Sequence, residues 1–321
     1  MTMPRSTQRL AIVFGVLLIV TLAFNVFERR ATTSRTREFA RIDAEDVTRI
    51  EVRGQDGQEV ALVREGDRWI MADPVNWPAD QDAVATMLEK AAELSVTNIV
   101  SSNPSNHDRY EVGPDTGILV RLLGGRDGDR RLITFYIGAV TPDINGTYIR
   151  EFGSDDTWAA NGLLRGYFNK TVGAWRDRTI FALDPASVTS IQVQSPDAEW
   201  TLHRRGSIVG APDAAWVVAA EGEVFPADST RAAAVVRTAA TLRATDFPSG
   251  SSADDADWEN PFKSALMTLA DGSMAAFSVA EVPGDEARYY LRKEGAEQVF
   301  IIYRSTLDAV FRPLDQVKAT G

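Results

Sequence analysis

The chain has 321 residues, enough for a short anchor and two domains of ordinary size. Its 44% apolar and 25% charged residues describe a globular protein with real cores and exclude a disordered one. The net charge is −11, and because the first 41 residues hold seven Arg against Glu28 and Glu38, the remainder carries −16. A body that acidic repels phosphate backbones, which argues against nucleic acid as a partner. The lack of cysteine excludes disulfides, thiolate nucleophiles and cysteine-based metal sites.

The amino-terminal part contains an apolar segment long enough to cross a membrane. From Leu10 to Phe27, eighteen residues carry no charge. At ~1.5 Å per residue they cover ~27 Å, close to the ~30 Å hydrocarbon thickness of a bilayer. A cleaved signal peptide is the alternative, but its apolar stretch is usually ~7–15 residues and ends in small residues, which Phe27-Glu28-Arg29 does not supply. We therefore expect residues 1–9 in the cytoplasm and an uncleaved anchor over 10–27.

The charges beside this segment give conflicting indications of its orientation. Four arginines at 29, 30, 35 and 37 outnumber Arg5 and Arg9, so a positive-inside count keeps the body in the cytoplasm. That rule weakens for long translocated domains, and a charged amino terminus followed at once by an apolar stretch is typical of a signal-anchor. We expect a single-pass inner-membrane protein whose body lies outside, in the periplasm, after a spacer over 28–41.

The first folded module is expected over residues 42–170. Alternating apolar and polar residues predict a hairpin of strands at 47–52 and 60–63 around Gln55-Asp56-Gly57, and Trp69 lies in a third strand. Asp80 is expected to cap a helix whose apolar face is made by Val84, Met87, Leu88, Ala91 and Leu94. Further strands are predicted at 118–123, 132–137, 147–150 and 157–160.

The second module is expected over residues 188–315, between a connector at 171–187 and a tail at 316–321. It has the same plan. Asp228 caps its long helix and Ser305 is expected to cap a closing helix. Its strands are predicted at 188–193, 200–203, 216–218, 265–269, 275–279, 289–292 and 299–303. The predicted fold class is α+β: an amino-terminal transmembrane helix followed by two tandem repeats of an antiparallel sheet covered by a helix.

Sequence anchors recur in one order in both modules. Trp77-Pro78-Ala79-Asp80 returns as Phe225-Pro226-Ala227-Asp228, and Tyr148-Ile149-Arg150 as Tyr290-Leu291-Arg292. Val47-Thr48-Arg49-Ile50-Glu51-Val52 likewise returns as Val188-Thr189-Ser190-Ile191-Gln192-Val193. Repeated anchors with small changes in spacing indicate a duplicated module, which favours binding and assembly over catalysis.

The order of these motifs resembles a known family over roughly residues 45–315. The chain resembles the domain of unknown function numbered 4340 in several features. These are a strand pair, a tryptophan-containing strand, Pro-Ala-Asp before a helix, Tyr-x-x-Gly-Pro at 110–114 and Arg-Asp-Arg at 176–178. The resemblance implies a membrane-anchored protein found with gliding-motility-like ABC transporters, which comprise an ATPase, a permease and a large extracytoplasmic partner. It implies no catalytic residues. The second module lacks the glycine of the loop, having Trp258-Glu259-Asn260-Pro261, so a binding role of the first loop need not extend to it.

The residue types that carry chemistry are sparse. His107 and His203 are the only histidines, and the sequence contains no hydrolase, zinc-protease, phosphate-loop or dinucleotide motif. The acidic cluster at 254–259 lacks the glycine turn of a calcium loop, so a solvated loop is favoured. We therefore expect no catalytic, metal-binding or cofactor-binding residues.

Six residues are candidates for a partner or ligand surface: Trp77, Tyr110, Phe225, Trp258, Arg176 and Arg178. For the conspicuous aromatic residues core packing is the favoured interpretation, since each such ring buries ~150–250 Å², and a repeated aromatic groove is the alternative. Arg176 and Arg178 flank Asp177 and are expected to tie the modules together, with docking as the alternative.

The favoured function is a non-catalytic accessory subunit, held at the membrane through residues 10–27, that binds components of an integral membrane transporter or other extracytoplasmic proteins. One alternative is a periplasmic ligand-binding protein that uses the cleft between the modules. A carboxylate-dependent hydrolase is the third hypothesis, and it would need two acidic groups ~5–9.5 Å apart in a cleft.

Overall fold

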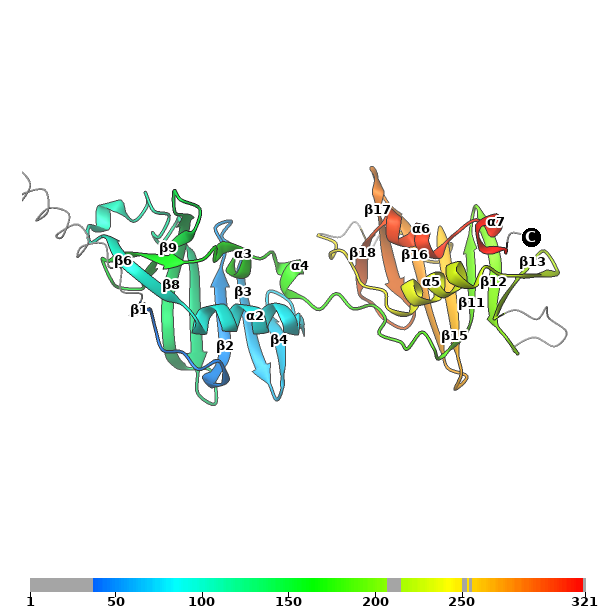
Figure 1. Cartoon of the computed structure of the whole chain (residues 1–321), viewed down its shortest axis with the longest axis horizontal. Coiled ribbons are helices and arrows are strands. Elements are labelled where there is room, and N and C mark those ends of the chain that lie inside the picture. The colour runs from blue at the N-terminus through cyan, green and yellow to red at the C-terminus, as the bar shows by residue number, and fades with distance from the viewer. Residues whose placement is uncertain (1–36, 207–214, 250–252, 254–255, 320–321) are drawn as a thin grey trace, which may run out of the picture. The chain divides into compact units, whose positions relative to one another are not determined.

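The computed structural model describes residues 37–206, 215–249, 253 and 256–319. The chain divides between Arg176 and Asp177 into two compact units, here called module 1 and module 2 (Figure 1). Each unit is one antiparallel sheet with a few helices, which confirms the predicted α+β class. The expected anchor at 10–27 lies outside the described residues, and among those that are described no helix is long and apolar enough to span a bilayer.

The sheet of module 1 has ten strands in the order β1-β6-β10-β9-β8-β7-β2-β3-β4-β5. Its strands are β1 (Arg37–Glu38), β2 (Val47–Arg53), β3 (Glu59–Glu65), β4 (Arg68–Asp73), β5 (Trp77–Pro78), β6 (Ser95–Ser101), β7 (Ile118–Gly124), β8 (Arg130–Val140), β9 (Gly146–Glu151) and β10 (Thr157–Asn161). Its helices are η1 (Ala44–Asp46), α2 (Gln81–Ala92), η2 (Pro104–Asn106), α3 (Arg165–Phe168) and α4 (Val172–Trp175).

Helix α2 lies across one face of this sheet, here called the inner face (Figure 1). It begins at the expected cap, where Asp80 Oδ1 accepts a hydrogen bond from the Ala83 amide at 3.0 Å. All five apolar residues predicted for its sheet-facing side are buried, as are Trp69 of β4 and Trp175 of α4. The favoured interpretation of Trp69 as a core residue is therefore confirmed.

The sheet of module 2 has eight strands in the order β14-β13-β12-β11-β15-β16-β17-β18. They are β11 (Val188–Ser195), β12 (Ala198–Arg204), β13 (Trp216–Ala220), β14 (Glu223–Pro226), β15 (Lys263–Leu269), β16 (Met274–Val282), β17 (Asp285–Lys293) and β18 (Val299–Tyr303). Three helices accompany them: α5 (Ser229–Ala240), α6 (Arg304–Val310) and α7 (Leu314–Val317). Helices α5 and α6 lie on the inner face of this sheet (Figure 1).

The strand order of module 2 matches the run β5-β4-β3-β2-β7-β8-β9-β10 of module 1. The register matches as well: a shift between Val47 and Arg49 opposite β7 recurs between Val188 and Ser190 opposite β15. Where β6 pairs with β10, module 2 has a single bridge between Asp246 and Ile301. Residues at the same register position can therefore be compared between the modules.

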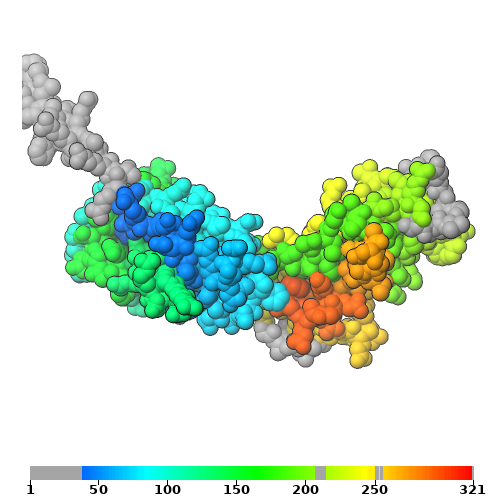
Figure 2. All heavy atoms as spheres, turned by 90° about the horizontal axis from the view of Figure 1, so that it is seen from below, coloured from blue at the N-terminus to red at the C-terminus, as the bar shows by residue number. Residues whose placement is uncertain are grey.

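Three features differ from the sequence-based expectations. Strand β6 was not predicted. Strand β1, which pairs with β6, lies in the expected spacer. Figure 2 shows the first described residues of the chain, in dark blue, along the surface of module 1. The prediction that Ser305 caps the closing helix is wrong. Helix α6 begins at Arg304 and its N-cap residue is Tyr303, whose side chain makes no capping bond.

Candidate functional site

Trp77 and Phe225 occupy equivalent edges of the two sheets, and each ring faces a cation from the end of its own module. The Arg176 guanidinium carbon lies 4.8 Å from the centre of the Trp77 ring, and Lys318 Nζ lies 3.2 Å from the centre of the Phe225 ring. Backbone bridges hold both cations in place, from Ala79 to Arg176 and from Ala227 to Lys318. Both rings are half-buried. These contacts fasten the last residues of each module to its edge strand.

The two arginines of the Arg-Asp-Arg motif belong to different modules. Arg176 is only 8% exposed and is the last residue of module 1. Arg178 Nη1 donates a hydrogen bond to the Thr245 carbonyl of module 2 at 3.3 Å. Asp177 Oδ1 accepts a bond from the Thr179 amide at 2.9 Å. The contact of Arg176 with Trp77 and the hydrogen bond of Arg178 to Thr245 thus each lie within one module.

Tyr110 lies in a loop, residues 102–117, that covers part of the outer face of module 1, opposite α2. Its ring meets the Tyr148 ring edge-on at 4.7 Å between centres. It also packs against a small cluster in which Val112 is 0%, Leu119 3% and Tyr136 4% exposed. The Tyr-x-x-Gly-Pro motif therefore forms a second, smaller core with the sheet beneath it.

Polar contacts also hold this loop down. Arg150 of β9 stacks 4.5 Å from the Tyr136 ring centre and donates from Nε to the Val112 carbonyl at 2.9 Å. Burial lowers the pKa of the Arg150 guanidinium. Arg165 donates to Glu111 Oε2 at 2.6 Å, and this hydrogen bond lowers the pKa of the Glu111 carboxyl.

Glycine at position 138 of β8 lets the loop approach the strand closely. A Cβ there would lie 2.2 Å from the Tyr110 carbonyl oxygen and 2.7 Å from Val112 Cγ1. At the same register position in module 2 stands Ala280, which carries a Cβ and is 6% exposed. Ala280 therefore excludes the close approach that Tyr110 and Val112 make to Gly138.

Trp258 is the counterpart of Tyr110 and lies beside β17. The Arg292 guanidinium stacks 4.5 Å from its ring centre, and its indole Nε1 donates to the Ala253 carbonyl at 3.3 Å. Ala280 and Tyr290 form the buried cluster beneath it. Trp258 thus packs on the sheet near β17 and β18, and the described residues of its loop leave the strands beside them uncovered.

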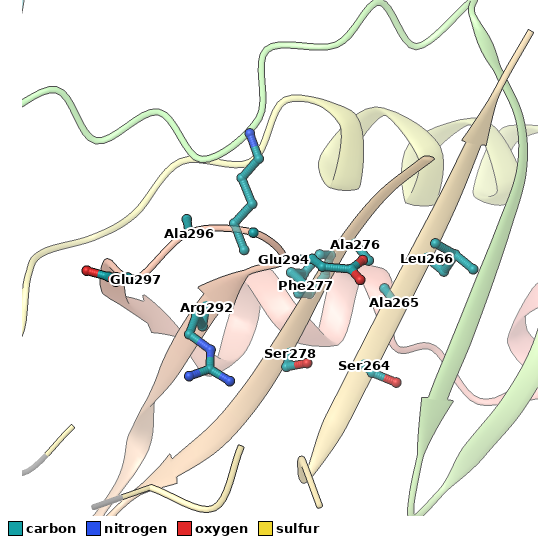
Figure 3. A pocket seen from close by; sticks show the side chains of 12 residues that line it. Ser264, Ala265, Leu266, Ala276, Phe277, Ser278, Arg292, Glu294, Ala296 and Glu297 are labelled. Carbon is teal, nitrogen blue, oxygen red and sulfur yellow. The ribbon is translucent and has the colours of Figure 1, made fainter. Parts of the chain in front are cut away.

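These uncovered strands form a pocket on the outer face of module 2, with a volume of about 530 Å³ (Figure 3). Ser264 of β15, Ser278 of β16 and Arg292 of β17 lie in one row across its floor, because Ser264 pairs with Ser278 and Ser278 with Arg292. Leu266 and Ala276 form the next row. Lys293, Glu294 and Glu297, from the end of β17 and the turn after it, also line the pocket.

The pocket offers hydrogen-bond donors and a small apolar patch, and these groups recognise a ligand more readily than they transform one. Among residues 37–206, 215–249, 253 and 256–319, no group of three His, Asp or Glu side chains could hold a metal ion. His107 Nε2 lies 3.0 Å from the Asp155 carbonyl, and burial lowers the pKa of His203. Asp257, from the acidic cluster, accepts from the Asn260 amide at 3.0 Å and so stabilises a turn.

Ser264, Ser278 and Arg292 were not among the site residues predicted from the sequence. One signal was present, since Tyr148-Ile149-Arg150 and Tyr290-Leu291-Arg292 are repeated anchors and both arginines stack on the aromatic residues of the outer face. The serines carry no motif. Only the strand register places them beside Arg292.

Comparison with known proteins gives one match. No curated protein and no solved structure is significantly similar to this chain. The sequence profile described as Domain of unknown function (DUF4340) matches residues 69–261, which is more than half of the chain and includes parts of both modules. The chain therefore belongs to the DUF4340 family.

Proposed function

We propose that this protein is a non-catalytic, membrane-anchored binding subunit whose two modules are tandem copies and lie outside the membrane, next to an ABC-transporter-like complex. The observation that carries the proposal is the open outer face of module 2. Its floor is made of short polar and apolar side chains beside a stacked arginine, and it is open to solvent among the described residues. Surfaces of this kind suit a polypeptide partner better than a small, enclosed substrate.

The apolar segment at 10–27 supports a location at the membrane. A helix of that length spans the hydrocarbon layer, and it would hold both modules close to an integral membrane partner. Tethering raises the effective concentration of the partner to the millimolar range, so an interface of modest area suffices. The transporter is proposed as that partner from the family resemblance.

The first experiment isolates the full chain from native membranes in mild detergent and identifies the proteins that travel with it. Recovery of an ATPase and a permease in constant ratio to the chain is expected. Recovery of the chain as a lone monomer would overturn the proposal.

The location is tested by cysteine labelling, because the natural chain has no cysteine and one introduced thiol reports alone. Arg237 is exposed on α5, so Arg237→Cys places a thiol at the surface without touching a core. A membrane-impermeant maleimide should label this variant in cells whose outer layer has been made permeable. Labelling only after the inner membrane is broken would place the body in the cytoplasm and contradict the proposed location.

A further inference from the structure

Four exposed apolar side chains lie at one end of the sheet of module 1. They come from the end of β8, the turn after it and the residues around α3, and are Val140 (38% exposed), Ile144 (68%), Leu163 (49%) and Tyr167 (36%). Hydrogen bonds join the turn to the segment before α3. The Gly162 amide donates to the Asn145 carbonyl at 3.0 Å, and the Leu164 amide donates to Thr147 Oγ1 at 3.0 Å. We call the four apolar residues the end patch.

The fold of module 1 does not account for isoleucine at position 144. Its φ is 58°, in the left-handed region that a β-branched residue rarely adopts and that glycine or asparagine adopts more easily. The side chain is also exposed, so it gains little from burial within its own chain. An apolar side chain that is both strained and exposed at a turn indicates a contact outside the module.

The end patch is nearly free of charge in a chain that is otherwise acidic. Segments 140–147 and 161–169 contain Asp143 and Arg165 as their only charged residues. Arg165 is paired with Glu111 at 2.6 Å, which neutralises it. The same two segments expose three amide side chains, those of Asn145, Asn161 and Asn169. Apolar side chains among neutral polar ones suit the boundary between the hydrocarbon and the headgroups of a bilayer.

The first described residue of the chain lies in the same register row as the end patch. This row crosses five strands through the paired residues Arg37, Val96, Ala160, Thr147 and Val140. At ~4.8 Å per strand, Val140 lies ~19 Å from Arg37 across the sheet. The apolar segment at 10–27 ends ten residues before Arg37. Because ten extended residues span at most ~33–36 Å, the end patch is within reach of the surface of a bilayer that holds this segment.

We infer that the end patch of module 1 enters the headgroup layer of the bilayer that holds the apolar segment at 10–27. This inference goes beyond the proposed function and rests only on its membrane anchor. Ile144 and Leu163 supply apolar side chains to the hydrocarbon boundary, and Tyr167 supplies a ring and a hydroxyl at the level of the headgroups. The anchor keeps module 1 close to the bilayer, so a contact of a few side chains suffices. Because the body is acidic, this end approaches the bilayer at the lowest electrostatic cost.

The test places a probe beside the end patch without removing any of its four residues. The natural chain has no cysteine, so Asn161→Cys in the full chain takes a single environment-sensitive fluorophore. The chain is reconstituted into phosphatidylcholine vesicles whose lipids carry a nitroxide quencher near the headgroup. The control is Asp127→Cys, in the exposed turn before β8, which lies ~34 Å away along that strand. Nitroxide should quench the probe at 161 about threefold or more as strongly as the probe at 127, because the apolar face of a seated segment lies ~5–10 Å deep.

Two substitutions, made with the probe at 161, distinguish a bilayer contact from a structural role. Leu163→Glu should lower the ratio of seated to free module 1 about tenfold or more, because an apolar side chain is replaced by a charge. Met274→Glu makes the same kind of change at an exposed apolar residue of module 2 and should leave the quenching unchanged. Ile144→Asn should weaken the quenching without lowering the thermal unfolding temperature, since asparagine adopts a positive φ more readily than isoleucine.

Circular dichroism checks that each variant is folded, and Ile144→Asn decides the matter if Leu163→Glu is not. Equal quenching of the probes at 161 and 127, or undiminished quenching in Ile144→Asn, overturns the inference. Shielding of the probe at 161 from aqueous iodide in native membranes, without nitroxide quenching in vesicles, overturns it too, because the occupant would then be a membrane protein. If the chain enters vesicles but the probe at 161 is not quenched, the inference fails and the proposed anchor stands. A chain that does not enter vesicles contradicts both.

Discussion

Gly138→Ala should lift the loop off the outer face of module 1. The new Cβ would lie 2.2 Å from the Tyr110 carbonyl oxygen and 3.0 Å from that of Glu111. Both contacts are with backbone, so no side-chain rotation relieves them. The loop must move away and weaken two hydrogen bonds, from the Ala139 amide to Tyr110 at 3.0 Å and from Arg150 to Val112 at 2.9 Å.

The expected cost is about 1–3 kcal/mol. If the loop stays in place, overpacking costs about 1–3 kcal/mol. If the loop moves away instead, the two weakened hydrogen bonds cost about 0.5–1.5 kcal/mol each. The loop takes whichever of these two routes costs less. Because the contacts are local, most of this cost should appear as opening of residues 104–117 and not as unfolding of the whole chain.

Hydrogen exchange measured by mass spectrometry reads this opening directly. The Val112 amide is bonded to His107 and the Gly117 amide to Gly113, both at 2.9 Å, so both are protected when the loop is seated. Gly138→Ala should speed their exchange by about fivefold or more, while protection in module 2 stays the same. The control is Gly166→Ala in α3, whose Cβ would meet nothing within 4 Å. Unchanged protection of residues 104–117 in Gly138→Ala would refute the seated loop.

Three further predictions concern single contacts. Asp80→Ala removes the α2 cap and should lower the free energy of unfolding of module 1 by about 1 kcal/mol, as measured by denaturant unfolding. Asp80→Asn keeps a capping oxygen and should cost only a few tenths of a kcal/mol. Equal losses in the two variants would contradict the capping role. Arg165 lowers the pKa of the Glu111 carboxyl. The stability that this contact gives the folded chain is therefore fully present above pH 4.5, the ordinary glutamate pKa, and is lost as pH falls through the lowered pKa. Stability should therefore fall less steeply below pH 4.5 in Glu111→Gln than in the natural chain, and parallel pH profiles would exclude this contribution. Lys318→Gln removes the cation over Phe225 and should lower the stability of module 2 by about 0.5–1 kcal/mol, with Lys318→Arg retaining most of it.

The pattern of apolar residues was sufficient to predict most elements of both sheets and both long helices. Helix α2 has its N-cap and its buried face where spacing placed them, since periodicity and capping act over a few residues. Strand β6 escaped prediction because Thr97 and Asn98 interrupt its alternation, and it is formed through pairing with β10 across about 60 residues. Ser305 does not cap α6, because the chain already turns into the helix after Tyr303.

The candidate site was less predictable because it depends on strand register and on loop length. The sequence shows that Trp77 and Phe225 are equivalent, but the cations on their rings, Arg176 and Lys318, come from far along the chain. Arg292 was visible as a repeated residue. That Arg292 lines a pocket while Arg150 bonds to the Val112 carbonyl follows from the tertiary structure, which the sequence alone did not show.

The most direct test of an uncovered outer face in module 2 and a covered outer face in module 1 is a pair of single cysteines at one register position, shared by Leu119 and Ser264. Leu119 is 3% exposed, whereas Ser264 lies on the pocket floor. In the purified full chain, Ser264→Cys should react with a maleimide at least tenfold faster than Leu119→Cys, and in native membranes the Ser264→Cys thiol should become protected. Equal rates for the two purified variants, or a Ser264→Cys thiol that reacts equally fast in both settings, would contradict this account.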